Sequence, residues 1–191
     1  KHIINNLVAN FNFDNFARAS NDPRIELYNL YMHEVKGISS KKTILELKRM
    51  LDEHKKIFHK TELYELYIGL TSMCVTLKGK NSNSTEYLNL LFEIYKDALN
   101  NGVLSNPSTG SIDLLRFRNV LISALDILNI GWAEKFLKTY VKTLPAEQAG
   151  NLEYFFTGMI EYAKGNSEKA LELVSKLDQS KFVFMNDLKF L

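Results

Sequence analysis

The sequence predicts an all-α fold made of stacked antiparallel helix pairs, and two observations support this prediction. Apolar residues recur at spacings of three and four rather than two, which is the period of a helix face. Residues 120–144 also match residues 154–178 after a shift of 34 positions. An internal repeat of this length indicates one supersecondary unit used more than once, with neighbouring units sharing a core.

The match between the two copies extends to residue chemistry. Each copy begins with an apolar run, continues through a glycine and ends in a second run with charged residues at matching places. The matched positions are Gly131 with Gly165, Leu137 with Leu171, Lys142 with Lys176, and Glu134 and Lys135 with Glu168 and Lys169. The repeat therefore predicts two successive helix pairs, each with a turn at its glycine.

The N-terminal part begins with a helical segment expected over residues 3–19. Asp22 then supplies a cap acceptor ahead of Pro23, a residue suited to the first position of a helix. Gly37 can adopt the left-handed conformation that ends many helices. These signals predict a second helix over residues 22–37.

Hydroxyl residues mark the starts of the next three helices. Ser40, Thr61 and Ser84 each precede a run with helical apolar spacing, where a side-chain oxygen can accept a bond from a free backbone N–H. The polar run over residues 80–84 is typical of a loop. The expected helices cover residues 40–58, 61–79 and 84–99, and the last two are expected to form a pair.

An irregular connection over residues 101–110 separates the less regular N-terminal half from the repeated half. Helices are then expected at residues 111–129, 132–143, 145–164 and 167–177, with the start of a further helix over 181–191. We expect residues 1–191 to form one helical-repeat domain. Its helix pairs are expected to be irregular over about 1–100 and repeat-like over about 111–177.

The spacing within the last helix pair resembles the tetratricopeptide repeat. Tyr154 is an aromatic residue early in the first helix, and Gly158 is a small residue where two helices cross closely. Gly165 stands at the turn, and Ala170 faces back across the crossing. The resemblance covers roughly residues 118–177 and is clearest after Gly165.

The upstream copy departs from this pattern at one position. Val120, Ala124 and Gly131 stand where the last pair has its aromatic, small and turn residues, but Phe136 replaces the second small residue and is expected to alter the packing angle. Pro145 follows the second helix, where the family often has proline. The resemblance implies a right-handed α-solenoid whose concave groove binds peptides or proteins.

Four apolar residues are the candidate partner-binding residues of that groove: Leu121, Leu125, Phe155 and Met159. Peptide-clamping members of the family place Lys and Asn at comparable positions to hold a terminal carboxylate. The apolar residues favour instead an apolar ligand, a partner helix or another part of the same protein. Aromatic rings such as Phe155 can line a groove at low entropic cost, and packing in the core is the alternative interpretation.

A stripe of basic pairs is the second candidate site. The pairs recur every seven residues, nearly two helical turns, so they share one side of the helix expected over 40–58. They are Lys41, Lys42, Lys48, Arg49, Lys55 and Lys56. Such a stripe can bind phosphate or an acidic peptide, and we expect weak, salt-sensitive binding to polyanions. The alternative is a solvated face, because three acidic residues each stand four positions from one of these cations. Those acidic residues are Glu46, Asp52 and Glu53.

Residue patterns for catalysis or metal binding are weak. His54 and His59 are five positions apart, so they lie on different helical faces, unlike metal ligands at i and i+4. Glu153 and Glu161 can share a face, as paired catalytic carboxylates do, but a solvated face is the favoured interpretation. The sequence has no His-Glu-x-x-His, phosphate-binding glycine loop or nucleophile elbow. We therefore expect no enzyme activity, no metal and no cofactor.

Charge and composition bear on partners and compartment. Lys and Arg total 24 against 22 Asp and Glu, a net charge of +2, so no global field attracts nucleic acid or an anionic membrane. No apolar run approaches the roughly 18 residues of a membrane span. The lone Cys74 lies in an apolar stretch, which indicates a buried thiol and suits a reducing compartment such as the cytoplasm.

The C-terminal residues 181–191 form an apolar stretch that ends like a helix cut short. We expect the chain to be a fragment of a longer protein whose next repeat covers this end. In isolation, the chain is expected to self-associate through it.

These observations favour a non-enzymatic scaffold that binds a protein or peptide on the concave face of a helical repeat. The alternative is a regulatory or structural segment of a larger enzyme or transcription factor whose active domain lies outside this chain.

Overall fold

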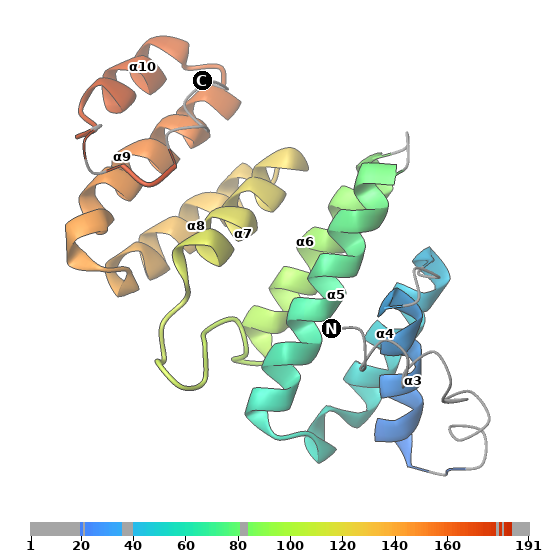
Figure 1. Cartoon of the computed structure of the whole chain (residues 1–191). Helices are drawn as coiled ribbons and strands as arrows, with labels where there is room; N and C mark the ends of the chain where they lie inside the picture. The colour runs from blue at the N-terminus through green and yellow to red at the C-terminus, as the bar shows by residue number, and fades with distance from the viewer. Residues whose placement is uncertain are drawn as a thin grey trace. The chain divides into compact units, whose positions relative to one another are not determined.

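The described part of the chain is helical. The structure is a computed structural model, and it describes residues 20, 22–35, 40–80, 84–178, 180 and 182–184. These residues form eight α-helices and two short 3-10 helices, and none of them lies in a strand (Figure 1). The all-α class is therefore confirmed. The segment expected over 3–19 and the helix end expected at Gly37 lie outside the described residues.

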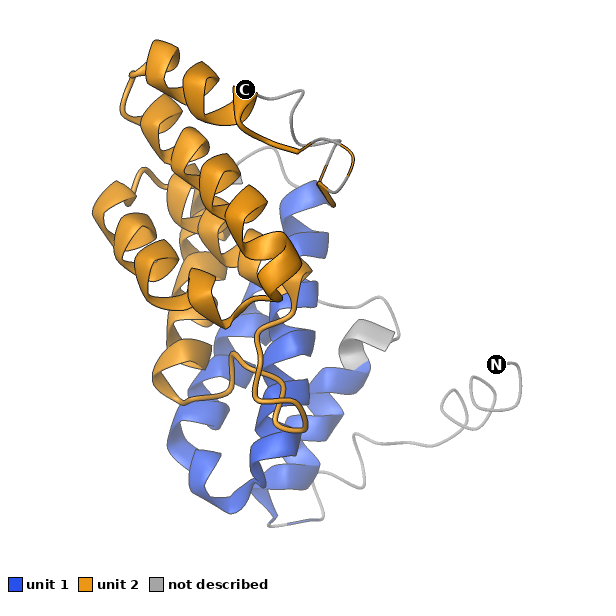
Figure 2. Cartoon of the chain, turned by 90° about the vertical axis from the view of Figure 1, so that its left-hand side faces the viewer, with its two compact units in different colours: residues 1–82 blue, residues 83–191 orange. Residues whose placement is uncertain are grey.

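The chain divides into two compact units, Lys1–Ser82 and Asn83–Leu191 (Figure 2). Unit 1 contains α3 (Pro23–Val35), α4 (Lys41–His54), the 3-10 helix η1 (Lys55–Ile57) and α5 (Lys60–Lys80). Unit 2 contains α6 (Ser84–Asn100), α7 (Leu114–Asp126), α8 (Ile130–Tyr140), the 3-10 helix η2 (Val141–Thr143), α9 (Ala146–Ala163) and α10 (Ser167–Ser175). The boundary falls between α5 and α6, and the pairing expected for these two helices stays a prediction.

In unit 1, helix α4 packs against both α3 and α5. Its apolar residues at helical spacing, Ile44, Leu47 and Leu51, are all buried. Leu27 of α3 is buried as well. The apolar stripe that the sequence places on one side of this helix is therefore its core-facing side.

Helices α3 and α5 approach closely at Gly69. A Cβ atom added there would overlap the ring of Tyr31 on α3, so the position requires glycine as long as that ring keeps its place. Farther along α5, the Cys74 side chain is fully buried, as the sequence indicated.

Side-chain caps at two predicted positions are confirmed. The backbone N–H of Thr43 donates to Ser40 Oγ at 3.2 Å and starts α4. The backbone N–H of Arg24 donates to Asp22 Oδ1 at 2.9 Å and starts α3. The helix that begins after Ser40 ends at His54 and continues as the 3-10 helix η1, so the expected α-helix over 40–58 was too long.

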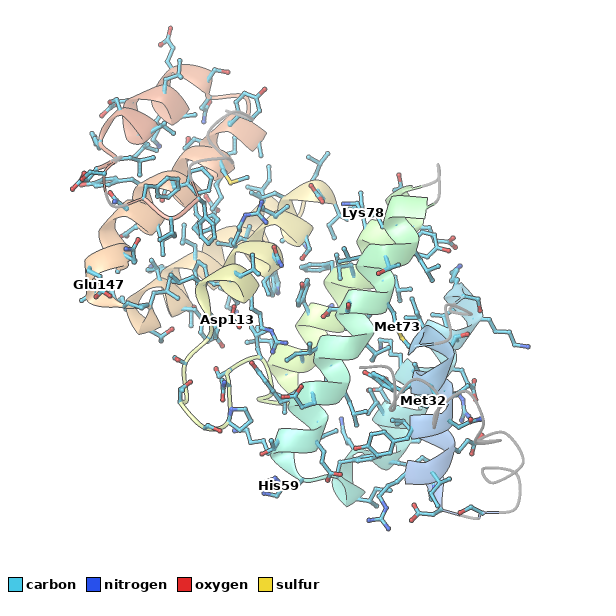
Figure 3. All side chains as sticks on the ribbon, in the orientation of Figure 1. Met32, His59, Met73, Lys78, Asp113 and Glu147 are labelled. Atoms are coloured by element: carbon cyan, nitrogen blue, oxygen red, sulfur yellow. The ribbon has the colours of Figure 1, made fainter. Side chains whose placement is uncertain are left out.

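The start of α5 differs from the prediction. His59, labelled in Figure 3, caps it in place of Thr61: its Nδ1 accepts from the Thr61 backbone N–H at 3.3 Å. The His59 backbone N–H in turn donates to Glu62 Oε2 at 3.0 Å. This reciprocal arrangement is a capping box with an imidazole as the acceptor.

In unit 2, each helix contacts the next one along the chain, from α6 to α10. The buried Phe117 ring lies with its centroid 5.1 Å from that of Phe136 and 5.5 Å from that of Phe156. Helices α9 and α10 cross closely at Gly158, where an added Cβ would lie 3.4 Å from the Ala170 carbonyl oxygen. The close crossing that the sequence placed at these two small residues is therefore present.

Helix α7 starts three residues later than predicted. Asp113, labelled in Figure 3, is its cap, because its Oδ1 accepts from the Arg116 backbone N–H at 2.8 Å. Ser111 belongs to the preceding connection, where Gly102 and Gly110 have positive φ angles. A carboxylate acceptor at the right offset thus sets the helix start.

The turns after α7 and α9 share one backbone geometry. In both, two consecutive N–H groups bond back to the carbonyls of the ending helix, and the first of the two residues has positive φ. The bonds run from Leu128 to Leu125 and from Asn129 to Ala124 at 2.8 Å, and from Gly165 to Tyr162 and from Asn166 to Glu161 at 2.9 Å. Equivalent residues such as Leu128 and Gly165 are therefore 37 positions apart.

This spacing corrects the sequence match of 34 positions. Gly131 lies within α8, not in the left-handed turn position, which Leu128 occupies with φ +56°. The residue equivalent to Ala170 is then Ala133, and both are buried. The sequence-based prediction that Phe136 replaces a small residue at the helix crossing is therefore wrong.

Candidate functional site

The four residues expected on the inner face differ in burial. Leu121 and Phe155 are fully buried, whereas Leu125 and Met159 are half-buried. The Phe155 ring centroid lies 4.9 Å from that of Phe182, so the two rings pack together in unit 2. Leu121 and Phe155 are core residues in this structure, and their contact with a partner stays a prediction that requires them to become exposed.

The described start of the C-terminal segment packs on its own unit. Phe182 is buried against Phe155, and Phe184 lies under the Arg118 guanidinium, 5.7 Å from ring centroid to Cζ. Residues 183 and 184 lie in a turn, and the rest of 181–191 apart from residue 182 lies outside the described residues, so the helix expected there stays a prediction. Val183 remains exposed. Self-association through this end stays a prediction.

The basic stripe is partly occupied by intrahelical ion pairs. Arg49 bonds to Glu46 at 2.6 Å and to Glu53 at 2.5 Å, and Lys48 bonds to Asp52 at 3.2 Å. The hydrogen bond from Arg49 holds the pKa of Glu46 below its ordinary value. The stripe residues Lys41, Lys42 and Lys48 lie on α4, whereas Lys55 and Lys56 lie on η1. This pairing is what the solvated-face interpretation expects.

The two glutamates weighed as paired carboxylates line one groove but have different surroundings. Glu153 is exposed, whereas Glu161 is 4 % exposed. Glu161 accepts from Asn166 Nδ2 at 2.8 Å and from Lys164 Nζ at 3.0 Å, and Lys169 Nζ lies 3.3 Å away. These bonds lower the pKa of Glu161 to about 2. A carboxylate held in this way is a structural anion, not a proton donor near neutral pH.

The groove itself lies between α8 and α9 and has a volume of about 360 Å³. Its apolar lining comes from Leu137, Val141 and Ile160. Lys138 and Lys142 stand one turn apart at its edge, both exposed. Neither has a carboxylate within ion-pair distance among the described residues. The other lining residues are Glu134, Glu153, Thr157 and Glu161.

Two carboxylates that line this groove, those of Glu134 and Glu161, share one ion-pair partner. Lys164 at the end of α9 bonds to Glu134 near the start of α8 at 2.6 Å, and the same ammonium reaches Glu161. The charges of the two carboxylates are therefore satisfied within the protein. Lys138 and Lys142 are left as the cations available to a ligand.

A second hollow lies between α6 and α8 and is lined by aromatic rings. Trp132, Phe136 and Tyr140 stand at positions i, i+4 and i+8 of α8 and line a volume of about 230 Å³. The remaining lining residues are Leu99, Asn100, Lys135 and Thr139. This row is not among the residues predicted from the sequence, although its spacing of four residues is visible there.

Metal and membrane features are absent from the part of the chain that the structure describes. There, no three His, Cys, Asp or Glu side chains are grouped so that they could hold a metal ion. None of the helices in the described ranges combines the length and apolar character needed to cross a bilayer.

Comparison with known proteins gives no match. No family model, curated protein or solved structure matches the chain. The tetratricopeptide resemblance therefore stays a proposal.

Proposed function

We propose that the chain is a non-enzymatic scaffold of stacked antiparallel helix pairs, similar to tetratricopeptide repeats, that binds a protein or peptide. The matching turns at Leu128 and Gly165 support the repeated unit. Ala133 and Ala170 support it further, because each is a buried small residue four positions after the cap of its helix. Small residues at such positions let two helices approach closely.

The observation that carries the proposed function is the groove between α8 and α9. Binding pockets combine an apolar lining with a few polar groups that fix orientation, and volumes of roughly 300 Å³ and above are typical. Here Leu137, Val141 and Ile160 supply the apolar surface, and Lys138 and Lys142 supply two available cations. The best-fitting occupant is a peptide with a bulky apolar residue next to an acidic one.

The two parts of this occupant contribute differently. Burial of the apolar side chain supplies most of the affinity, at about 25 cal/mol per Å². An exposed ion pair adds about 1 kcal/mol or less, and salt screens it. Lys138 and Lys142 therefore act mainly on peptide choice and association rate.

A peptide-display library offered to the whole chain tests the proposal. We expect selected peptides to share an apolar residue next to Asp or Glu. The double charge reversal Lys138→Glu with Lys142→Glu should weaken their binding about tenfold or more in a fluorescence anisotropy titration. The matched control, Lys60→Glu with Lys78→Glu, changes the net charge equally on α5 of unit 1, outside the basic stripe, and should leave binding unchanged.

Two results would count against the groove. One is a set of selected peptides without acidic residues. The other is binding that both double variants weaken to the same extent, because a general charge effect would then explain it. Circular dichroism of each variant checks that the helices are retained.

A further inference from the structure

The aromatic rings of α8 at Trp132, Phe136 and Tyr140 form a continuous row of contacting rings. The Trp132 ring stacks on Phe136 with a centroid separation of 5.2 Å and an interplanar angle of 11°, and Phe136 lies 4.9 Å from Tyr140. Phe92 of α6 meets Trp132 edge-on at 4.9 Å. Phe136 is buried, whereas Trp132 and Tyr140 are half-buried. The outer two rings therefore present part of their surface to the hollow in fixed orientations.

The polar groups around the row are predominantly hydrogen-bond donors. The Trp132 indole N–H and the Lys135 ammonium can only donate, and the Tyr140 hydroxyl and the Asn100 amide each carry a donor. Within the described residues, none of these four side chains has a hydrogen-bond or ion-pair partner. A ligand that offers acceptors on an apolar body would suit such a site.

Packing alone does not require aromatic residues at these positions. At the positions 37 residues later, Trp132 corresponds to Lys169 and Phe136 to Leu173 of α10, and Tyr140 corresponds to Leu177, two residues after that helix ends. Lys169 projects outward and pairs with Glu161. A lysine and two leucines thus occupy the positions at which α8 and its extension have three aromatic rings. The rings are therefore not a requirement of the repeated helix pair.

A polyproline II helix has the chemistry that this hollow lacks. Proline has no backbone N–H, so the carbonyl oxygens of a proline-rich segment are free acceptors beside apolar rings. Eight residues of α-helix rise about 12 Å. Polyproline II rises about 3.1 Å per residue, so about four of its residues span the row. Its preset conformation also reduces the entropy lost on binding.

We propose that the exposed surfaces of Trp132 and Tyr140, on either side of the buried Phe136, form a docking site for a proline-rich segment in the polyproline II conformation. The proline rings lie against the aromatic rings, and the indole N–H and the Tyr140 hydroxyl donate to peptide carbonyls. Lys135 at the edge favours an acidic residue next to the prolines. This site is separate from the groove between α8 and α9, so either can fail without the other.

The chain carries a single tryptophan, so its fluorescence reports this site alone. The probe is a synthetic peptide of about ten prolines with an aspartate at one end, added to the whole chain. We expect a saturable blue shift of the Trp132 emission, because the peptide displaces water from the indole. A Gly/Ser peptide of equal length and charge should cause no shift.

Substitutions separate the row from the rest of unit 2. Tyr140→Phe removes one hydroxyl donor and should weaken peptide binding about three- to tenfold. Tyr162→Phe is the matched control, since Tyr162 is an exposed tyrosine of α9 that does not line the hollow. It should bind the peptide as the unaltered chain does. The double variant Lys138→Glu with Lys142→Glu should also retain binding.

Four outcomes would overturn this proposal. The first is a Trp132 emission that stays constant up to millimolar polyproline, and the second is an equal shift caused by the Gly/Ser peptide. The third is a shift by an amphipathic helical peptide at lower concentration than polyproline. The fourth is an emission that changes with protein concentration alone. The last outcome would assign the row to contact between copies of the chain.

Discussion

Gly165 and Gly131 give a direct test of the register between the two helix pairs. With the sequence match of 34 positions they are equivalent, and replacing either by alanine should have the same effect on stability. In the structure they differ: Gly165 has φ +86° in the turn, whereas Gly131 lies inside α8. An added Cβ would meet no atom within 4 Å at either position, so the backbone conformation alone decides the outcome.

The magnitudes follow from that conformation. An L-residue in the left-handed region costs about 1–2 kcal/mol, and alanine recovers about 0.4–1 kcal/mol by restricting the unfolded chain. We therefore expect Gly165→Ala to lower the free energy of unfolding by about 1 kcal/mol. Gly131→Ala adds a better helix former with no strain and should raise it by about 0.5–1 kcal/mol. The two variants should differ by about 1.5–2 kcal/mol.

Urea titration followed by Trp132 emission measures this difference. Trp132 and both glycines belong to unit 2, so the signal reports the unit in which the substitutions are made. Agreement with far-UV circular dichroism would check that a single transition is being followed. Shifts of the same sign and size for the two variants would refute the register of 37 positions.

Three further predictions concern unit stability and the thiol. Glu161→Gln should lower the free energy of unfolding by about 1–2 kcal/mol, a value reduced because the lysine partners of Glu161 are partly solvated. The pKa of Glu161 is lower in the folded state than in the unfolded state, so its contribution to stability should be present above about pH 4.5 and disappear towards pH 2. Unfolding measured over a series of acid pH values checks this. Gly158→Val should cost about 1–3 kcal/mol in urea unfolding, because even a Cβ atom would lie 3.3 Å from a Val174 methyl carbon. Cys74, whose pKa burial raises to about 11, should react with a thiol reagent at mildly alkaline pH only after urea is added.

Local signals in the sequence predict the helices well. Ser40 and Asp22 cap the helices that the sequence assigned to them, because a cap depends on residues within one turn. The error at Thr61 has a local cause as well. The cap acceptor is the His59 imidazole, and the Glu62 carboxylate accepts from the His59 backbone N–H. A glutamate three positions after His59 therefore indicates the helix start in the sequence.

The register of the repeat is harder to read from residue identity. Gly131 and Gly165 match by type, but the turn is defined by which residue takes positive φ and by the carbonyls it bonds. Leu128 takes that conformation, although leucine is not a residue type that favours positive φ, and its side chain is 72 % exposed. Aligning Gly131 with Gly165 therefore displaces α8 by three residues relative to α10. Three residues are close to one helical turn, so apolar positions still coincide and the sequence match does not reveal the displacement.

The candidate sites follow from what faces each side of α8, which periodicity alone does not reveal. Leu121 and Phe155 were expected in a groove and are fully buried, and the Phe155 ring packs against Phe156 and Phe182. Trp132 and Tyr140 have the helical spacing of core residues, yet both are only half-buried beside α6.

Helix α8 thus has a chemically different surface towards each neighbour. Towards α9 it offers Lys138 above an apolar lining, and towards α6 it offers three rings surrounded by donors. Both sets lie within one eleven-residue helix and its 3-10 extension. The equivalent helix α10 has the same cap geometry but neither feature, since Ser175 stands at the place of Lys138 and Lys169 at that of Trp132. Shared cap geometry therefore accounts for the repeated helix start, whereas the lysines and rings of α8 are not needed for that start, which is why we assign them to the two proposed binding sites.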